Sequence, residues 1–170
     1  MPAGAGPRVT HIIGLISDTH GLVRPAVHDA LAGVELILHA GDVGGSEILD
    51  ELALIAPVAA VRGNTDAPAS PGLVDRIERE VGGLSLHVSH GHELGSPTPE
   101  RLLSRYAADI IVFGHTHRPL VVRVGGEGAA ARLVINPGGA GPARFDLRPS
   151  VARLTIRNGR ADAELIELAG

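Results

Sequence analysis

The stretch that decides the fold runs Ile110-Ile111-Val112-Phe113-Gly114-His115-Thr116-His117. An apolar run of this length that ends at a glycine is typical of a strand buried on both faces of a sheet. The two histidines then lie in the loop at the carboxyl end of the strand, where ligands bind in open α/β sheets. Two imidazoles on such a loop make a good metal-ligand pair, although a surface loop that happens to contain histidines would look the same.

The same arrangement, an apolar run followed by polar residues and a glycine, occurs at four other places in the chain. The predicted strands over 9–17, 35–39, 58–61 and 84–89 end, in that order, at Asp18 with His20, at Asp42, at Asn64 and at His90. The neighbouring glycines give the backbone the freedom to turn these side chains toward one point. A single Asp-x-His or Gly-Asp pair is weak evidence, but five such strand ends predict a common site.

The order of the predicted elements indicates two sheets. Helices over 25–32 and 46–55 separate the first three strands, so the front half has a β-α-β-α-β pattern. A hairpin over 75–89 and a helix over 99–108 follow, and from Leu120 onward the pattern is antiparallel. Asn158-Gly159 between the last two strands is a strong hairpin signal. Two sheets packed face to face, with helices outside, accommodate both halves in a single domain over residues 1–170, with residues 1–8 expected to fray.

Composition excludes several classes of function. The net charge is −4, and the 15 basic residues are scattered, so the sequence shows no basic stripe for duplex nucleic acid. Three aromatic residues are too few to stack the bases of a single strand. No apolar run approaches the roughly 20 residues that cross a membrane. The chain has no cysteine, which excludes thiolate sites and fits the cytoplasmic location that we expect.

The side chains at the strand ends predict two metal ions. Seven side chains exceed the roughly four that one tetrahedral site needs, and they fit two metals that share one carboxylate. The mixture of imidazole nitrogen, carboxylate and amide oxygen suits Mn²⁺, Fe, Co²⁺, Ni²⁺ or Zn²⁺ better than Mg²⁺ or Ca²⁺. Two metals about 3.5–4 Å apart provide a bridging hydroxide and hold the oxygens of an in-line displacement. Hydrolysis of phosphate esters is therefore the expected reaction.

Together these motifs resemble the calcineurin-like metallophosphoesterases, and the segments Gly63-Asn64-Thr65-Asp66 and Asn136-Pro137-Gly138-Gly139 are most similar to the small YfcE-like phosphodiesterases. The resemblance implies an α/β fold, a four-layer α/β/β/α sandwich of two mixed sheets. It implies that the first metal is held by Asp18, His20, Asp42 and His117, and the second by Asp42, Asn64, His90 and His115. Asp42 would bridge the two ions. A metal-bound hydroxide, with no protein residue, would be the nucleophile that attacks a small phosphoester.

Other residues are expected to support this site. Larger members of the family carry a histidine at position 65 that protonates the leaving group, and Thr65 cannot do so near neutral pH. His92, His39, Thr65 and Asn136 are candidates for orienting the ligands or for binding phosphate. His11, His28 and His87 are expected to be structural or exposed, Arg144 an exposed structural residue, and Asp66 a loop or turn residue.

Manganese is the expected metal, and a homo-oligomer formed through an exposed edge strand is a further prediction. Two rival functions stay open at this point. One is a non-catalytic interaction scaffold of the retromer-subunit type, and the other is a nuclease that acts on short oligonucleotides.

Overall fold

The computed structural model describes residues 9–125, 131–144 and 146–169, so the predicted fraying of residues 1–8 lies outside it. The first sheet is mixed and has six strands. Their order is β11 (Arg160–Glu167), β10 (Ser150–Arg157), β1 (Thr10–Ile16), β2 (Leu36–His39), β3 (Val58–Val61) and β4 (Leu73–Val74). Strands β1 to β4 are parallel, and β10 pairs antiparallel with both β1 and β11.

The second sheet is also mixed. Its five strands lie in the order β5 (Ile77–Val81), β6 (Leu84–Val88), β7 (Ile110–Val112), β9 (Arg132–Asn136) and β8 (Leu120–Val124). The three central strands β6, β7 and β9 are parallel, and the edge strands β5 and β8 run antiparallel to their neighbours.

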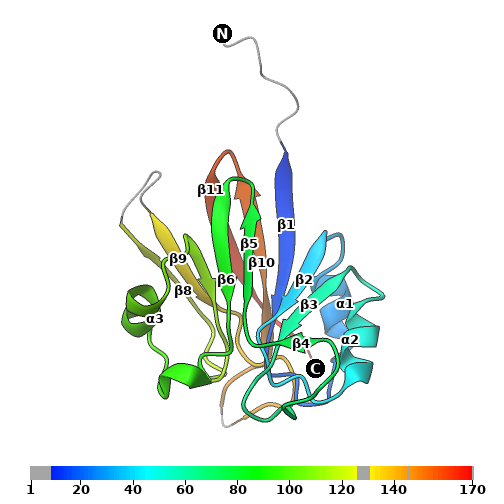
Figure 1. Ribbon diagram of the computed structural model, residues 1–170. Helices are drawn as coiled ribbons and strands as arrows, with labels where there is room; N and C mark the ends of the chain where they lie inside the picture. The colour runs from blue at the N-terminus through cyan, green and yellow to red at the C-terminus, as the bar shows by residue number, and fades with distance from the viewer. Residues whose placement is uncertain (1–8, 126–130, 145, 170) are drawn as a thin grey trace.

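The helices cover the two outer faces. Helices α1 (Ala26–Ala30) and α2 (Ser46–Leu52) lie outside the first sheet, and α3 (Pro99–Arg105) and the 3₁₀ turn η1 (His92–Leu94) lie beside the second (Figure 1). Three apolar clusters separate the layers. Ile13, Leu15, Leu38, Val88, Val112 and Ile135 fill the space between the sheets; Ile16, Val27, Leu31, Ile37, Ile48 and Leu52 lie under α1 and α2; Leu102, Ile111, Phe113 and Val134 lie under α3. The predicted four-layer α/β/β/α sandwich is confirmed.

The alternation along β7 explains why its sequence is apolar throughout. Ile110 and Val112 face the space between the sheets, whereas Ile111 and Phe113 face α3, and all four are at most 1% exposed. A strand with one exposed face alternates apolar and polar residues, whereas β7 is buried on both faces and is therefore apolar at every position.

The ends of some elements differ from the predicted ones. Helices α2 and α3 each end three residues earlier than predicted, and the two-residue strand β4 was not predicted. A two-residue strand is too short to show a period, so pairing with β3 defines it. Within the described residues, no helix is long and apolar enough to cross a membrane.

Candidate metal centre

The loops that follow β1, β2, β3, β6 and β7 meet at one end of the sandwich. Hydrogen bonds between backbones extend the strand pairing into these loops: Asp18 N–H donates to Gly41 O at 2.9 Å and His20 N–H to Asp42 O at 3.0 Å. In the second sheet, Gly114 N–H donates to His90 O at 3.0 Å. These backbone hydrogen bonds therefore hold the Asp18–His20 loop against the Asp42 loop, and the His115 loop against the His90 loop.

The backbone at this end is strained. Six described residues other than glycine have a positive φ, and five of them belong to the predicted ligand set: Asp18, His20, Asp42, His115 and His117, with φ between 45° and 72°. The sixth, Asn158, lies in the β10–β11 turn. A side chain in this region costs on the order of 1–3 kcal/mol, and such residues cluster at functional sites. These five backbone conformations lower the stability of the fold, and they occur where the predicted ligands lie.

Two glycines allow neighbouring motifs to approach closely. A Cβ atom on Gly41 would lie 2.6 Å from His90 Nδ1, and one on Gly63 would lie 2.1 Å from Asp42 Oδ1. Both separations are far shorter than van der Waals contact. Both glycines are thus required by packing, and Gly41 is favoured also by its φ of 103°.

The first group of potential ligands is Asp18, His20 and His117. Asp18 Oδ1 lies 3.2 Å from His117 Nε2 and 3.7 Å from His20 Nε2, and the two imidazole nitrogens are 3.3 Å apart. Asp18 Oδ2 accepts hydrogen bonds from Ser17 Oγ at 2.6 Å and from His115 N–H at 3.1 Å. Asp18 Oδ1 is buried and has no hydrogen-bond partner among the described residues. A buried carboxylate oxygen of this kind is suited to a cation.

The second group is Asp18, Asp42 and His90, so Asp18 belongs to both groups, and its Oδ1 lies 3.9 Å from His90 Nε2. His90 Nε2 lies 3.2 Å from Asp42 Oδ2 and 3.0 Å from Asn64 Oδ1, and His115 Nδ1 lies 3.1 Å from the same amide oxygen. Asp42 Oδ2 is also 3.7 Å from His20 Nε2, so this oxygen lies between the two groups. The structure therefore brings all seven predicted residues together.

Protonation states favour cation binding. Burial by itself raises the pKa of Asp42 and Asp18. The neighbouring His90 imidazole and Thr65 N–H at Asp42, and the neighbouring His117 imidazole and Ser17 hydroxyl at Asp18, hold both pKa values below normal. Burial lowers the pKa of the His20 and His115 imidazoles.

His90 is the exception in the set. Burial lowers the pKa of His90, but the Asp42 carboxylate outweighs it and raises the pKa above normal. A metal bound at His90 Nε2 must therefore displace a proton that Asp42 stabilises. His90 Nδ1 lies 2.7 Å from Ala40 O, which fixes the ring with Nε2 toward Asp42.

Two of the supporting candidates lie behind the ligands. His39 is fully buried, and burial lowers its pKa to about 4, so its imidazole is neutral. Its Nε2 lies 2.9 Å from Thr19 Oγ1, and its Nδ1 accepts from Gly41 N–H at 3.1 Å. The Thr19 hydroxyl itself donates to Val43 O at 2.7 Å, so His39 Nε2 is the donor to it. His39 thereby ties the loop of Asp18 to the loop of Asp42.

Asn136 has a similar role beneath the His115–His117 loop. Its side-chain amide donates to Gly114 O at 3.1 Å and Thr116 Oγ1 at 3.0 Å, and its Oδ1 accepts from Gly138 N–H at 2.9 Å.

The other two candidates, Thr65 and His92, are more exposed. The Thr65 side chain lies at the surface, and the backbone N–H of Thr65 donates to Asp42 Oδ1 at 2.9 Å. The His92 ring is half-exposed, 5.3 Å from that of His90.

Asp66 lies in a loop, as predicted, and its side chain has a role that sequence reasoning did not find. Its carboxylate accepts from Gly63 N–H at 2.8 Å, Val43 N–H at 3.0 Å and Gly44 N–H at 3.2 Å. These donors belong to the two loops that present Asn64 and Asp42. Asp66 is therefore a turn residue whose carboxylate also forms a brace between the two loops. The only sequence signal was its place within Gly63-Asn64-Thr65-Asp66.

Comparisons with known proteins agree with this geometry. The family model for the calcineurin-like phosphoesterase superfamily domain matches residues 12–159. A "Probable metallophosphoesterase" of Methanothermobacter thermautotrophicus is 35% identical over 163 residues, which cover 91% of this chain and 91% of that protein. The "Probable metallophosphoesterase YsnB" of Bacillus subtilis is 32% identical over 165 residues, covering 92% and 90%.

Solved structures share the fold. Vacuolar Protein Sorting 29 from Cryptosporidium parvum has a TM-score of 0.73 at 23% identity, with 95% of this chain and 99% of that chain covered. A structure described as a novel archaeal phosphodiesterase has a TM-score of 0.68 at 23% identity, covering 91% and 99%. Both likenesses concern the fold alone. On the match over residues 12–159 and the two relatives above 30% identity, the chain belongs to the calcineurin-like phosphoesterase superfamily.

Proposed function

We propose that the chain is a hydrolase of phosphodiesters that holds two divalent cations, manganese first among them. Asp18, His20, Asp42 and His117 would hold one ion and Asp42, Asn64, His90 and His115 the other, with Asp42 shared. The observation that carries the proposal is the buried Asp18 Oδ1, which accepts no hydrogen bond from any described residue and has His20 Nε2 and His117 Nε2 both within 3.7 Å. The mixed nitrogen and oxygen donors fit a transition-metal dication.

The residues of the site supply charge and position. When bound, two dications offer an activated water at neutral pH and a positive clamp for phosphate oxygens. Asp18 and Asp42 stay ionised because their pKa values are held low, so they offset only part of the metal charge. The remaining positive charge attracts an anionic ester even though the whole chain carries −4. We also propose that residues 1–170 form a single phosphoesterase domain.

The identity of residue 65 supports diesters with acidic leaving groups. Position 65 holds an exposed threonine in place of the histidine that larger members of the family carry there, and a threonine hydroxyl does not protonate a departing alkoxide near neutral pH. An aryl or otherwise acidic leaving group departs without such help. The cytoplasmic location and the homo-oligomer expected from the sequence stay predictions.

A non-catalytic scaffold is the second candidate, because Vacuolar Protein Sorting 29 shares the fold. A surface that only binds partners gains nothing from five strained residues and a buried, unpartnered carboxylate oxygen at one end of the sheets. That cost in stability favours the enzyme.

The test is an assay of bis(p-nitrophenyl) phosphate with full-length protein loaded with Mn²⁺. We expect hydrolysis that chelation abolishes and Mn²⁺ restores. Asp18→Asn should lower the rate at least about 100-fold, since loss of a ligand costs no less than loss of a residue that orients one. Arg157→Ala, an exposed change at the opposite end of β10, is the matched control and should leave the rate unchanged. A folded protein that binds two metals and hydrolyses no diester would support the scaffold.

A further inference from the structure

Two adjoining cavities lie beside the second ligand group. One, of about 320 Å³, is lined by Arg62, Asp75, Arg76, Ser89, His92, Glu93, Arg105 and Tyr106. The other, of about 360 Å³, continues past Tyr106 to His87, and the two share Arg76, Arg105 and Tyr106. We call the pair the Tyr106 groove. Each volume falls at the low end of the range for small-molecule sites, roughly 300–1,000 Å³.

The groove opens next to the ligands. Ser89 immediately precedes His90, and the His92 ring centroid lies 5.3 Å from that of His90 and 6.4 Å from that of His115. A molecule whose phosphodiester reaches the metal centre can therefore place a neighbouring group in the groove.

The two arginines shared by both cavities lack strong carboxylate partners. The Arg105 guanidinium lies 5.2 Å from the centroid of the Tyr106 ring and pairs with no carboxylate among the described residues. Arg76 Nε lies 3.9 Å from Glu78 Oε1, and both side chains are more than half exposed, where an ion pair is weak.

Two of the three acidic residues that line the groove have partners other than Arg76 and Arg105. Asp75 pairs with Arg62. Glu93 accepts from Tyr106 Oη at 2.6 Å and from Gly91 N–H at 2.9 Å. The third carboxylate of the lining, Glu78, is the one that lies 3.9 Å from Arg76. Glu93 keeps its negative charge because its hydrogen-bond donors are neutral. The two cavities are lined by four arginines and three carboxylates, which gives the groove a formal charge of +1.

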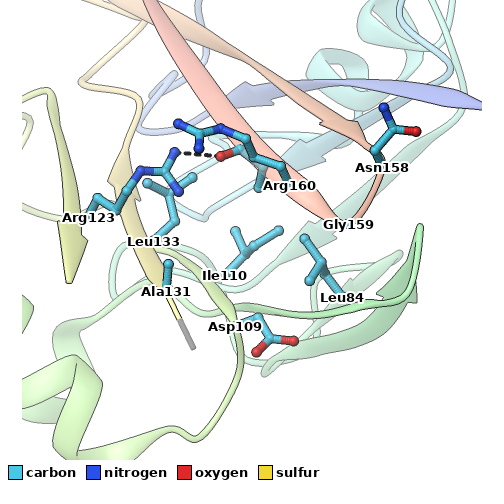
Figure 2. A pocket seen from close by; sticks show the side chains of 10 residues that line it. Leu84, Asp109, Ile110, Arg123, Ala131, Leu133, Asn158, Gly159 and Arg160 are labelled. Atoms are coloured by element: carbon cyan, nitrogen blue, oxygen red, sulfur yellow. Dashed lines mark hydrogen bonds between the residues drawn. The ribbon is translucent and has the colours of Figure 1, made fainter. Parts of the chain in front are cut away.

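A cavity at the other end of the sandwich provides a contrast. It also measures about 320 Å³ and lies between the start of β7 and the β10–β11 turn (Figure 2). Its charged groups are satisfied: Arg123 donates to Ala161 O and pairs with Asp162, Arg160 lies 3.3 Å from the same carboxylate, and Asp109 accepts from Ser85. In that cavity each arginine has a carboxylate within 3.3 Å, whereas among the described residues of the Tyr106 groove Arg105 has none and Arg76 has one at 3.9 Å.

We propose that the Tyr106 groove binds a second phosphoryl group of the substrate, carried beside the phosphodiester that is cleaved. Arg76 and Arg105 would contact its oxygens, because the planar guanidinium matches phosphate geometry. The favoured substrate class is then a short phosphorylated diester, such as a linear dinucleotide with a terminal phosphate. The assignment of this class rests on the proposed function, whereas the anion site itself does not.

Binding alone tests the anion site. Tyr106 is the only tyrosine and the chain has no tryptophan, so its fluorescence reports on the groove directly. Titration of full-length protein with pyrophosphate, without added metal, should give a saturable change in that fluorescence. Arg105→Ala and Arg76→Ala should each weaken binding about tenfold or more, as expected for a charged hydrogen bond, while Arg157→Ala should not. Because Arg76 does not contact the Tyr106 ring, its variant leaves the reporter intact. No saturable response, or equal affinity in all variants, would overturn the proposal.

Turnover tests the substrate class. The dinucleotides ApA and pApA share one phosphodiester and differ by the 5′-phosphate. The Mn²⁺-loaded protein should show a kcat/KM at least tenfold higher for pApA, and Arg105→Ala and Arg76→Ala should remove that preference while retaining the rate on ApA. Cleavage of ApA without any preference would overturn the groove assignment and retain the hydrolase. Failure to cleave any diester would overturn the hydrolase, and the pyrophosphate titration would still decide the anion site.

Discussion

His20 and His117 are 97 residues apart in the chain, and their Nε2 atoms lie 3.3 Å apart. The two rings are stacked with centroids 5.2 Å apart, and both nitrogens point toward Asp18 Oδ1. Three polar atoms that share one small space, with the oxygen otherwise unpartnered, form the arrangement that a cation stabilises. The relationship joins the loops after β1 and β7, and so joins the two sheets at the site.

Asp42 should be indispensable to both proposed metals. Its Oδ2 lies 3.7 Å from His20 Nε2 and 3.2 Å from His90 Nε2, so Asp42→Asn removes a charge from both groups. We expect the metal content to fall and diester hydrolysis to be lost, while circular dichroism reports an unchanged fold. Full hydrolysis by Asp42→Asn would remove the bridging role.

Asp66→Asn should weaken metal binding without touching a ligand. The Asp66 carboxylate accepts from three backbone N–H groups, and an amide nitrogen in its place would face donors. Loss of a group that orients ligands typically costs 10–100-fold in metal affinity, and we expect a loss of about that size by calorimetry with Mn²⁺.

Asp29→Asn is a control for Asp66→Asn because Asp29, on α1, lies away from the ligand loops. Its Mn²⁺ affinity should match the original chain. If Asp66→Asn also kept the original affinity, the brace between the two loops would have no effect on the site.

His39 should give the metal-free protein a pH-dependent stability. Burial lowers its pKa to about 4 in the folded chain, whereas an unfolded histidine titrates near 6.5. Below pH 6.5 the imidazole of His39 is protonated in the unfolded state and stays neutral in the folded state. The free energy of unfolding therefore falls as the pH falls toward 4. This residue should contribute a loss of about 3 kcal/mol over that interval.

The measurement is urea unfolding at several pH values for the original chain and for His39→Gln. The variant should lose less stability between pH 6.5 and 4, whatever its stability at pH 7. Parallel pH profiles for the two proteins would show that His39 does not titrate in this way.

The rate of diester hydrolysis should depend steeply on the leaving group. General acid catalysis typically contributes 10²–10⁴-fold, and position 65 offers only a threonine. Across methyl aryl and methyl alkyl phosphodiesters, the rate should fall as the pKa of the leaving alcohol rises. A flat dependence would mean that another group in the site donates the proton.

The convergence of the site was predictable because of topology. Apolar runs that end at Asp18, Asp42, Asn64, His90 and His115 predict strands, and the carboxyl ends of parallel strands meet at one edge. The β-α-β order and the hairpin signals then favour two sheets. Local sequence is therefore enough to predict which edge of the sheets carries the site and which residue types lie there.

The bracing contacts were not predictable from local patterns. Asp66 reaches Val43, 23 residues away, and His39 reaches Thr19, 20 residues away, and both distances depend on how two loops pack. The positive φ of Asp18 and Asp42 is likewise imposed by neighbouring loops, since neither residue type requires it.

The metal content of the purified, full-length protein tests the central claim most directly. After reconstitution with Mn²⁺ and removal of free ion, elemental analysis should find two metal ions per chain. His117→Ala should retain one, because Asp42, Asn64, His90 and His115 still form the second group. One ion or none per chain in a folded protein that fully hydrolyses bis(p-nitrophenyl) phosphate would contradict the dinuclear account.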